Sequence, residues 1–224
     1  MKYSIITPSS GHTGCLLRCR RRVLEQTVLA SPDPDSEWRD HVVIQENTRN
    51  TWKNATCGTD TVEWLVEVGP DWRENIVKLV ERARGEFCII FDDDDWYAPD
   101  YVEKSVESLG TLADVGGHLL QHTYHLPTGC WNTYMPGRGP LPGTLVFRLG
   151  YCLPHIQDNM KDPDWSIKHL YRMPQLFPAE PCRQRRMVGI KGIPDRGHLS
   201  VKHEYDASRF PNKDDERRSK LLGS

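Results

Sequence analysis

Four consecutive aspartates, the acidic segment at residues 92–95, follow an apolar run at residues 87–91. An apolar run of this length, bounded by polar residues, is typical of a buried strand. In open α/β sheets, ligands bind at the carboxyl ends of the strands. Carboxylates gathered there repel one another and lose hydration unless a cation balances them, and hard oxygen ligands suit Mg²⁺ or Mn²⁺. The pattern therefore predicts a divalent-metal site for a phosphate-bearing ligand, with a solvated turn that caps the next helix as the alternative.

Side-chain direction follows from the same pattern. If the acidic segment continues the strand, alternation sends Asp92 and Asp94 to one side and Asp93 and Asp95 to the other. The aromatic pair after the aspartates, Trp96 and Tyr97, either forms a flat wall against a sugar ring or packs in the core.

The elements that must position these residues alternate along the first 110 residues. Strands are expected at 3–7 (stopped by Pro8), 41–46, 62–69 and 87–91, and helices at 13–30, 72–84 and from 99 onward. The helix at 13–30 would place on its apolar side Leu16, Leu17, Val23, Leu24 and Val28. This order predicts an α/β fold with one Rossmann-like, mostly parallel sheet flanked by helices.

The regular alternation of expected strands and helices ends in the second part of the chain. Short β-like runs, notably residues 143–148, are followed by an expected helix at 163–171 and a strand near 198–202. The length of 224 residues fits one domain at 1–211. We expect a ligand-binding half at 1–110, a smaller β/loop half at 111–211, and a charged tail at 212–224.

Composition limits the functional classes. The net charge of −2 creates no global field that would attract DNA or an acidic membrane. The seven cysteines contain no CxxC pair, which argues against a disulfide framework and a zinc site. No apolar run is long enough for a signal peptide or a bilayer span, so we expect a soluble, cytoplasmic protein without membrane insertion.

The stretch GEFCIIFDDDDWYAPDYVE resembles the central motif of family 2 glycosyltransferases, which have the GT-A fold. In this register Asp92 and Asp94 match the two aspartates of the family's DxD motif, and Asp93 matches its variable centre. The resemblance implies a nucleoside-diphosphate sugar whose diphosphate is held by Mn²⁺ or Mg²⁺, mainly through Asp94. It places Asp92 near the ribose and sugar of the donor, and Asp95 as a third acid that orients the loop.

Other donor contacts are implied by the same resemblance. In SIITPSS, Thr7, Pro8 and Ser9 match the strand-Thr-Pro opening that holds the nucleoside. The family usually has an aspartate after its second strand, where this chain has Glu46, a possible acceptor for a uracil N3–H, so that UDP is favoured. Arg73 resembles a family arginine but lies about two residues upstream of the expected place.

The second half offers an expected catalytic base. In KDPDWSIKHLYR, Asp162 is positioned to cap a helix and Asp164 to follow in its first turn. The resemblance favours Asp164 as the base that deprotonates the acceptor hydroxyl in an inverting reaction, with Asp162 second, unless both only cap the helix. Late in the chain, the resemblance favours His203 over His198 as a further metal ligand, with a structural histidine as the alternative.

The acceptor is left open by the sequence. A glycan hydroxyl and a modified nucleic-acid base are both compatible, and small domains of this family also occur in viruses, in which case the compartment would be the host cytoplasm. Arginines cluster at 18–22 and 183–186, either as a solvated face or as a phosphate track. A nucleotidyltransferase is the alternative enzyme, although the Gly-rich loop with lysine is missing, and a non-catalytic nucleotide-sugar-binding module is the alternative outside enzymes.

Overall fold

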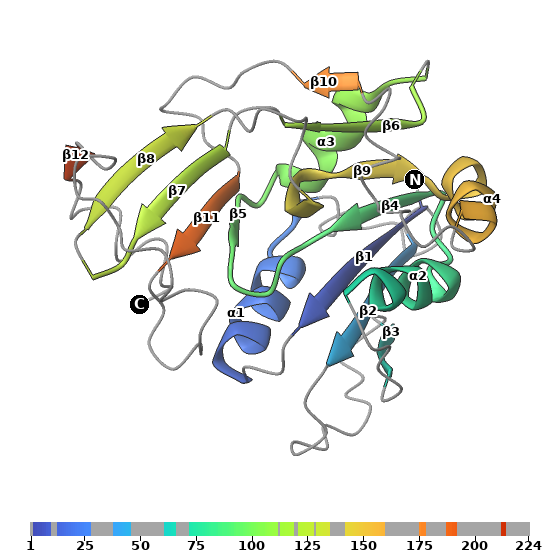
Figure 1. The fold of residues 1–224 in the computed structure, drawn as a ribbon, viewed down its shortest axis with the longest axis horizontal. Helices are drawn as coiled ribbons and strands as arrows, with labels where there is room; N and C mark the ends of the chain where they lie inside the picture. Colours follow the sequence, from blue (N-terminus) through green and yellow to red (C-terminus); the bar gives the residue numbers. More distant parts are fainter. Residues whose placement is uncertain are drawn as a thin grey trace.

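The computed structural model describes twelve segments of the chain. These are residues 2–9, 13–27, 38–45, 61–65, 72–111, 113–118, 121–127, 129–134, 142–159, 175–177, 187–191 and 212–213. They form two sheets with helices packed against the larger one (Figure 1).

The elements alternate in the first part of the chain and become strand-rich in the second (Figure 1). The strands are β1 (Lys2–Ser9), β2 (Trp38–Gln45), β3 (Thr61–Leu65), β4 (Phe87–Ile90), β5 (Trp96–Tyr97), β6 (Val115–His118), β7 (Gln121–His125), β8 (Cys130–Tyr134), β9 (Val146–Arg148), β10 (Gln175–Phe177), β11 (Met187–Lys191) and β12 (Asn212–Lys213). The helices are α1 (Thr13–Leu24), α2 (Trp72–Arg82), α3 (Tyr101–Leu109) and α4 (Leu149–Asn159), with a short 3-10 helix η2 (Pro142–Thr144).

The larger sheet has the strand order β10-β6-β9-β4-β1-β2-β3. β1 lies between β2 and β4 and runs parallel to both, β2 is parallel to β3, and β10 is parallel to β6. Only β9 reverses direction within this sheet, because it pairs antiparallel with both β4 and β6. The prediction of a mostly parallel sheet is therefore confirmed.

The smaller sheet has the order β12-β8-β7-β11-β5. β5 comes directly after the acidic segment and pairs antiparallel with β11, Trp96 opposite Val188 and Tyr97 opposite Met187. The chain therefore leaves the larger sheet at the end of β4 and enters the smaller sheet within six residues (Figure 1). Strands from both predicted halves enter both sheets, and the first two residues of the predicted tail form β12 against β8.

The core lies on both faces of the larger sheet. Alternating side chains of β4 divide between two buried clusters: Cys88 and Ile90 pack with α2 and α4, whereas Phe87 and Ile89 pack with α1 and α3. A strand buried on both faces reads as a continuous apolar run, as β4 does. Because burying each such side chain stabilises the fold by about 1.5–3 kcal/mol, β4 is a firmly held support for the acidic segment at its end.

The first strand extends beyond its predicted end. Pro8 and Ser9 belong to β1 and pair with Ile44 and Gln45 of β2, so the expectation that Pro8 stops the strand is wrong. In the described part of the sheet, the register of β1 with β4 ends at Ile6. Pro8 therefore lies where β1 is paired on one side, which tolerates a missing N–H.

The first helix ends earlier than its pattern predicts. α1 ends at Leu24 rather than continuing to residue 30, and residues 25–27 leave the helical path. Leu16 and Val23 are buried as expected, but Leu17 and Leu24 are 52% and 41% exposed. Hydrophobic spacing misjudged the helix because it carries no information about tertiary hydrogen bonds at its end.

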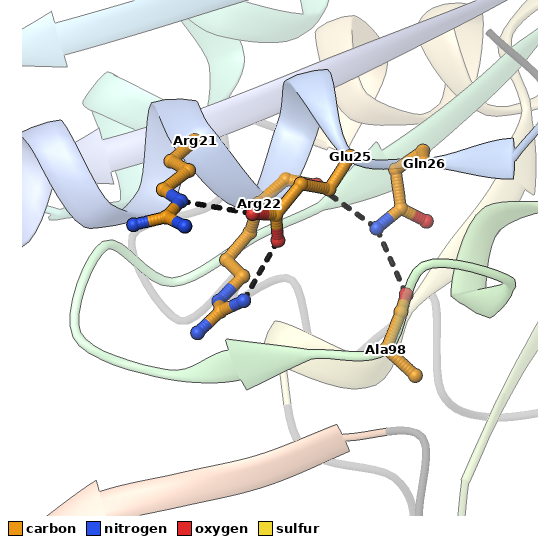
Figure 2. Close-up of polar contacts among 5 residues, drawn as sticks. All are labelled: Arg21, Arg22, Glu25, Gln26 and Ala98. Carbon is orange, nitrogen blue, oxygen red and sulfur yellow. Dashed lines mark hydrogen bonds and ion pairs between the residues drawn. The ribbon is translucent and has the colours of Figure 1, made fainter. Parts of the chain in front are cut away.

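Those bonds come from the buried side chain of Gln26 (Figure 2). Its amide Nε2 donates to the carbonyl oxygens of Arg22 (3.0 Å) and Ala98 (2.9 Å), and its Oε1 accepts from the Val102 N–H (3.0 Å). One side chain thus closes the end of α1 and ties it to the segment between β5 and α3. On the exposed side, Glu25 accepts from Arg21 and Arg22.

We expect Gln26→Met to lower the free energy of unfolding by about 2–4 kcal/mol, because the Ala98 carbonyl and the Val102 N–H lose their buried partner. Arg21→Ala is the matched control, since it breaks an exposed ion pair worth at most about 1 kcal/mol. Urea denaturation measures both. Equal stabilities of the two variants would contradict the role given to Gln26.

Candidate functional site

The acidic segment is a tight turn. The Asp95 N–H donates to the Asp92 carbonyl oxygen (3.3 Å), and the chain reverses from β4 into β5. The predicted alternation of the four side chains is therefore wrong, because it requires an extended backbone. Asp93 is 1% exposed and Asp94 and Asp95 are each 6% exposed, whereas Asp92 is half-buried. The alternative of a solvated acidic turn does not fit this burial.

Asp93 is held by the end of the neighbouring strand. The Ser9 hydroxyl at the carboxyl end of β1 donates to Asp93 Oδ2 over 2.6 Å, and both side chains are buried. Charge-assisted hydrogen bonds of this length are among the stronger ones in proteins. This bond spans 84 residues of sequence and fixes the turn to β1, the neighbour of β4 in the larger sheet.

Asp92 is held by Tyr97, whose hydroxyl is in turn bonded to Gly143. The Asp92 N–H donates to the Tyr97 hydroxyl oxygen (2.8 Å), and that hydroxyl donates to the Gly143 carbonyl oxygen (3.1 Å). Gly143 lies in η2, and a Cβ built on it would meet Asp92 Oδ2 at 2.5 Å. Sequence reasoning missed this contact, because its only trace is a glycine 51 residues after the aspartate.

The aromatic residues after the turn pack in the core. Tyr97 is fully buried and stacks on Phe91, with ring centroids 3.8 Å apart and planes at 8°. Trp96 lies in a separate buried cluster with Tyr124 and Trp131. The alternative of a flat wall against a sugar ring is therefore wrong for Tyr97.

Negative potential surrounds the acidic segment. Burial raises the pKa of the Tyr97 phenol well above its usual range, and the charges of Asp92 and Asp95 raise it further. Burial likewise raises the pKa of the Cys19 thiol, as do the charges of the aspartates, whereas its contact with Thr7 acts in the opposite direction. Burial is the larger cause for both groups, and the aspartate charges add to it because they disfavour a further negative charge nearby.

The donor set suits a hard divalent cation. The oxygen ligands offered by the acidic segment are those that Mg²⁺ and Mn²⁺ prefer. Among the described residues, no group of three or more His, Cys, Asp and Glu side chains is placed to hold a metal. Mg²⁺ at nucleotide sites is commonly bound through one or two carboxylates together with phosphate oxygens and water.

The remaining predicted site residues fall into two groups. Thr7 and Pro8 lie on β1 next to Ser9, so the structure brings the N-terminal motif beside the acidic segment. The backbone of Arg73 lies in the first turn of α2. Outside the described residues lie Glu46, Asp162, Asp164 and His203.

The sequence of residues 4–128, more than half of the chain, matches the profile of the family described as glycosyl transferase family 2. The chain belongs to glycosyl transferase family 2. The match to family 2 covers most of β1, the acidic segment and β5, whereas η2 lies beyond it. No curated protein gives a significant sequence match.

Solved glycosyltransferase structures share the fold. Residues 1–349 of S. aureus TarS align with a TM-score of 0.55 at 12% identity, over 85% of this chain and 60% of that one. The same TarS fragment in complex with UDP-GlcNAc aligns with a TM-score of 0.54 at 14% sequence identity. The alignment covers 86% of this chain and 59% of the TarS chain. The mannosyltransferase PcManGT from Pyrobaculum calidifontis, in complex with GDP-Man and Mn²⁺, aligns with a TM-score of 0.53 at 13% sequence identity. The alignment covers 87% of this chain and 58% of the PcManGT chain.

These likenesses confirm the GT-A fold that the sequence predicts. The chain spans about 60% of the length of the structures it matches. Within the described ranges, no helix is both long and apolar enough to cross a bilayer.

We expect Ser9→Ala to lower the free energy of unfolding by about 1.5–3 kcal/mol, because the buried Asp93 carboxylate loses a charge-assisted bond. A double-mutant cycle with Asp93→Asn separates this bond from other effects of each change. Thr27→Ala is the control, since it breaks an exposed bond to Glu103. A coupling energy near zero between positions 9 and 93 would show that the bond does not fix the turn.

Proposed function

We propose that the chain transfers a sugar, a hexose or a related one, from a nucleoside-diphosphate sugar to an acceptor hydroxyl, with a divalent cation at the acidic segment. The observation that carries the proposal is the buried turn of four aspartates at the carboxyl end of β4, in a chain of family 2 with the GT-A fold. The single domain expected at residues 1–211 would extend through β12 to residue 213, and it would act in the cytoplasm.

The donor proposal is supported by the proteins that share the fold. TarS has been solved with UDP-GlcNAc and with UDP, and PcManGT with GDP-Man and Mn²⁺. In this chain we propose that Thr7, Pro8 and Ser9 bind the nucleoside at the end of β1, adjoining the acidic segment. UDP is the favoured nucleotide because Glu46 can accept from the uracil N3–H, and Arg73 would lie near the phosphates.

The carboxylates of Asp94 and Asp92, with His203 as a third ligand, would hold the cation. When bound, Mn²⁺ or Mg²⁺ supplies positive charge that stabilises the leaving diphosphate. Asp93 is engaged by Ser9, so we assign it to the support of the turn and not to direct contact with the ion.

Asp164 would act as the general base. A carboxylate in the first turn of a helix is stabilised as an anion, so it is deprotonated and able to accept the proton of the acceptor hydroxyl. Attack from the face opposite the leaving group inverts the anomeric centre. The acceptor, a glycan hydroxyl or a hydroxylated nucleic-acid base, would approach from the side of the second half of the chain.

Nucleotide binding tests the metal proposal. We expect UDP to bind the wild type at least about tenfold more tightly with Mn²⁺ than with EDTA, and Asp94→Ala to lose that gain, because removing a ligand of the ion weakens its binding. Glu107→Gln, which removes an exposed carboxylate on α3, should bind like the wild type. Isothermal titration calorimetry gives the UDP affinity with Mn²⁺ and with EDTA. If Mn²⁺ strengthens UDP binding to Asp94→Ala as much as to the wild type, Asp94 does not hold the ion.

Asp164→Asn tests the base. We expect the variant to bind UDP and Mn²⁺ like the wild type but to transfer sugar about 10²–10⁴-fold more slowly, because no base remains to take the proton of the attacking hydroxyl. Asp162→Asn is the matched control, with a smaller effect expected because asparagine caps a helix about as well as aspartate does. Transfer from a radiolabelled UDP-sugar measures the rates of both variants. Undiminished transfer by Asp164→Asn would contradict the role of Asp164 as the base. Metal-dependent binding of UDP without any sugar transfer by the wild type would indicate a non-catalytic binding module.

A further inference from the structure

We propose that the Tyr97 hydroxyl and the space left by Gly143 position the Asp92 carboxylate for metal and donor binding. This inference rests on the proposed function and adds two positioning residues to it, one in β5 and one in η2. Neither residue belongs to the DDDD motif, and neither would itself touch the ion.

The hydroxyl of Tyr97 bridges two segments that are distant in sequence. It accepts the Asp92 N–H at 2.8 Å and donates to the Gly143 carbonyl oxygen at 3.1 Å. Using both the acceptor and the donor capacity of one hydroxyl fixes its orientation. The bridge therefore sets the distance between the start of the acidic segment and η2.

Gly143 is required here for space and not for backbone conformation. A Cβ at this position would lie 2.5 Å from Asp92 Oδ2, 3.0 Å from Asp92 Cγ and 3.1 Å from the Tyr97 hydroxyl oxygen. Among the described glycines, a positive φ occurs at Gly110 and Gly129 but not at Gly143. The carboxylate of Asp92 thus occupies the volume that a side chain at position 143 would fill.

The bridge is supported by rigid packing. The Tyr97 ring stacks on Phe91, and the Tyr101 ring meets it edge-on at 5.0 Å and 68°. All three side chains are fully buried. Because β5 is also paired with β11, the ring has little freedom to carry its hydroxyl elsewhere. Site residues held in this way keep their geometry before the ligand arrives, which lowers the entropic cost of binding.

A purely structural role for these residues makes a different prediction. If Tyr97 only satisfies two buried backbone groups, its loss lowers stability and leaves the affinity for the ion unchanged. If it positions Asp92, the affinity for the ion falls by more than any loss of stability explains. The decisive readout is therefore Mn²⁺ affinity in the presence of UDP, compared between variants that have lost similar amounts of stability.

Two variants and two matched controls provide this test. Tyr97→Phe keeps the stacked ring and removes the bridge, whereas Tyr101→Phe removes a buried hydroxyl from the same aromatic cluster and keeps the bridge. Gly143→Ala places a methyl group against the Asp92 carboxylate, whereas Gly150→Ala adds one where nothing lies within 4 Å. Electron paramagnetic resonance titration with UDP present gives the Mn²⁺ affinity, and urea denaturation gives the stability.

We expect Tyr97→Phe to weaken Mn²⁺ binding about fivefold, as the loss of one well-placed hydrogen bond would, and Gly143→Ala to weaken it more than about tenfold. The two controls should stay within about twofold of the wild type. Tyr97→Phe and Gly143→Ala proteins that bind Mn²⁺ like the wild type would overturn the inference. So would equal losses in Tyr97→Phe and Tyr101→Phe, which would assign the effect to ring packing.

Failure of the proposed function is distinguishable from failure of this inference. If the wild type binds UDP equally well with and without Mn²⁺, the metal site itself is refuted, and the inference with it. If the wild type and the controls show metal-dependent binding, and Tyr97→Phe and Gly143→Ala bind Mn²⁺ more weakly than they do, both stand. If Gly143→Ala does not fold, the pair of tyrosine variants decides the outcome alone.

Discussion

The burial of negative charge at the end of β4 is the constraint on which the site depends. Three of the four aspartates in the acidic segment are less than a tenth exposed. Taking carboxylates out of water is unfavourable by several kcal/mol each unless donors or a cation compensate. The Ser9 hydroxyl compensates Asp93 in part, and under the proposed function a divalent ion would add positive charge beside the other aspartates. The same cation would place positive charge where the diphosphate of the proposed donor needs it, so one interaction would serve both folding and function.

The architecture converts this constraint into a defined geometry. β4 is buried on both faces of the larger sheet, and the turn after it delivers the chain at once into the smaller sheet. The acidic segment is therefore anchored on three sides: by β4 before it, by Ser9 at the end of β1, and by Tyr97 in β5. A site carried on strands of two sheets is held more precisely than one on loops alone.

Much of this fold was predictable from local pattern, because β1, β4 and the helices before and after β4 have strong periodicity and clear chemistry around them. Other features depend on contacts between distant residues. The end of α1 is determined by the hydrogen bonds of Gln26 to Ala98 and Val102. The directions of the aspartate side chains are determined by a turn, which the spacing of residues in the sequence does not reveal. The approach of Gly143 to Asp92 needs η2 folded back along β4, so only a three-dimensional structure reveals it. The predicted base and third metal ligand lie outside the described residues and stay predictions.

The most direct measurement is anomalous X-ray diffraction from crystals of the chain grown with UDP and Mn²⁺. The account predicts one strong manganese peak beside the acidic segment, about 2 Å from a carboxylate oxygen of Asp94 and in contact with the diphosphate. UDP bound at the end of β1 with no manganese peak at residues 92–95, or with the ion held elsewhere, would contradict it.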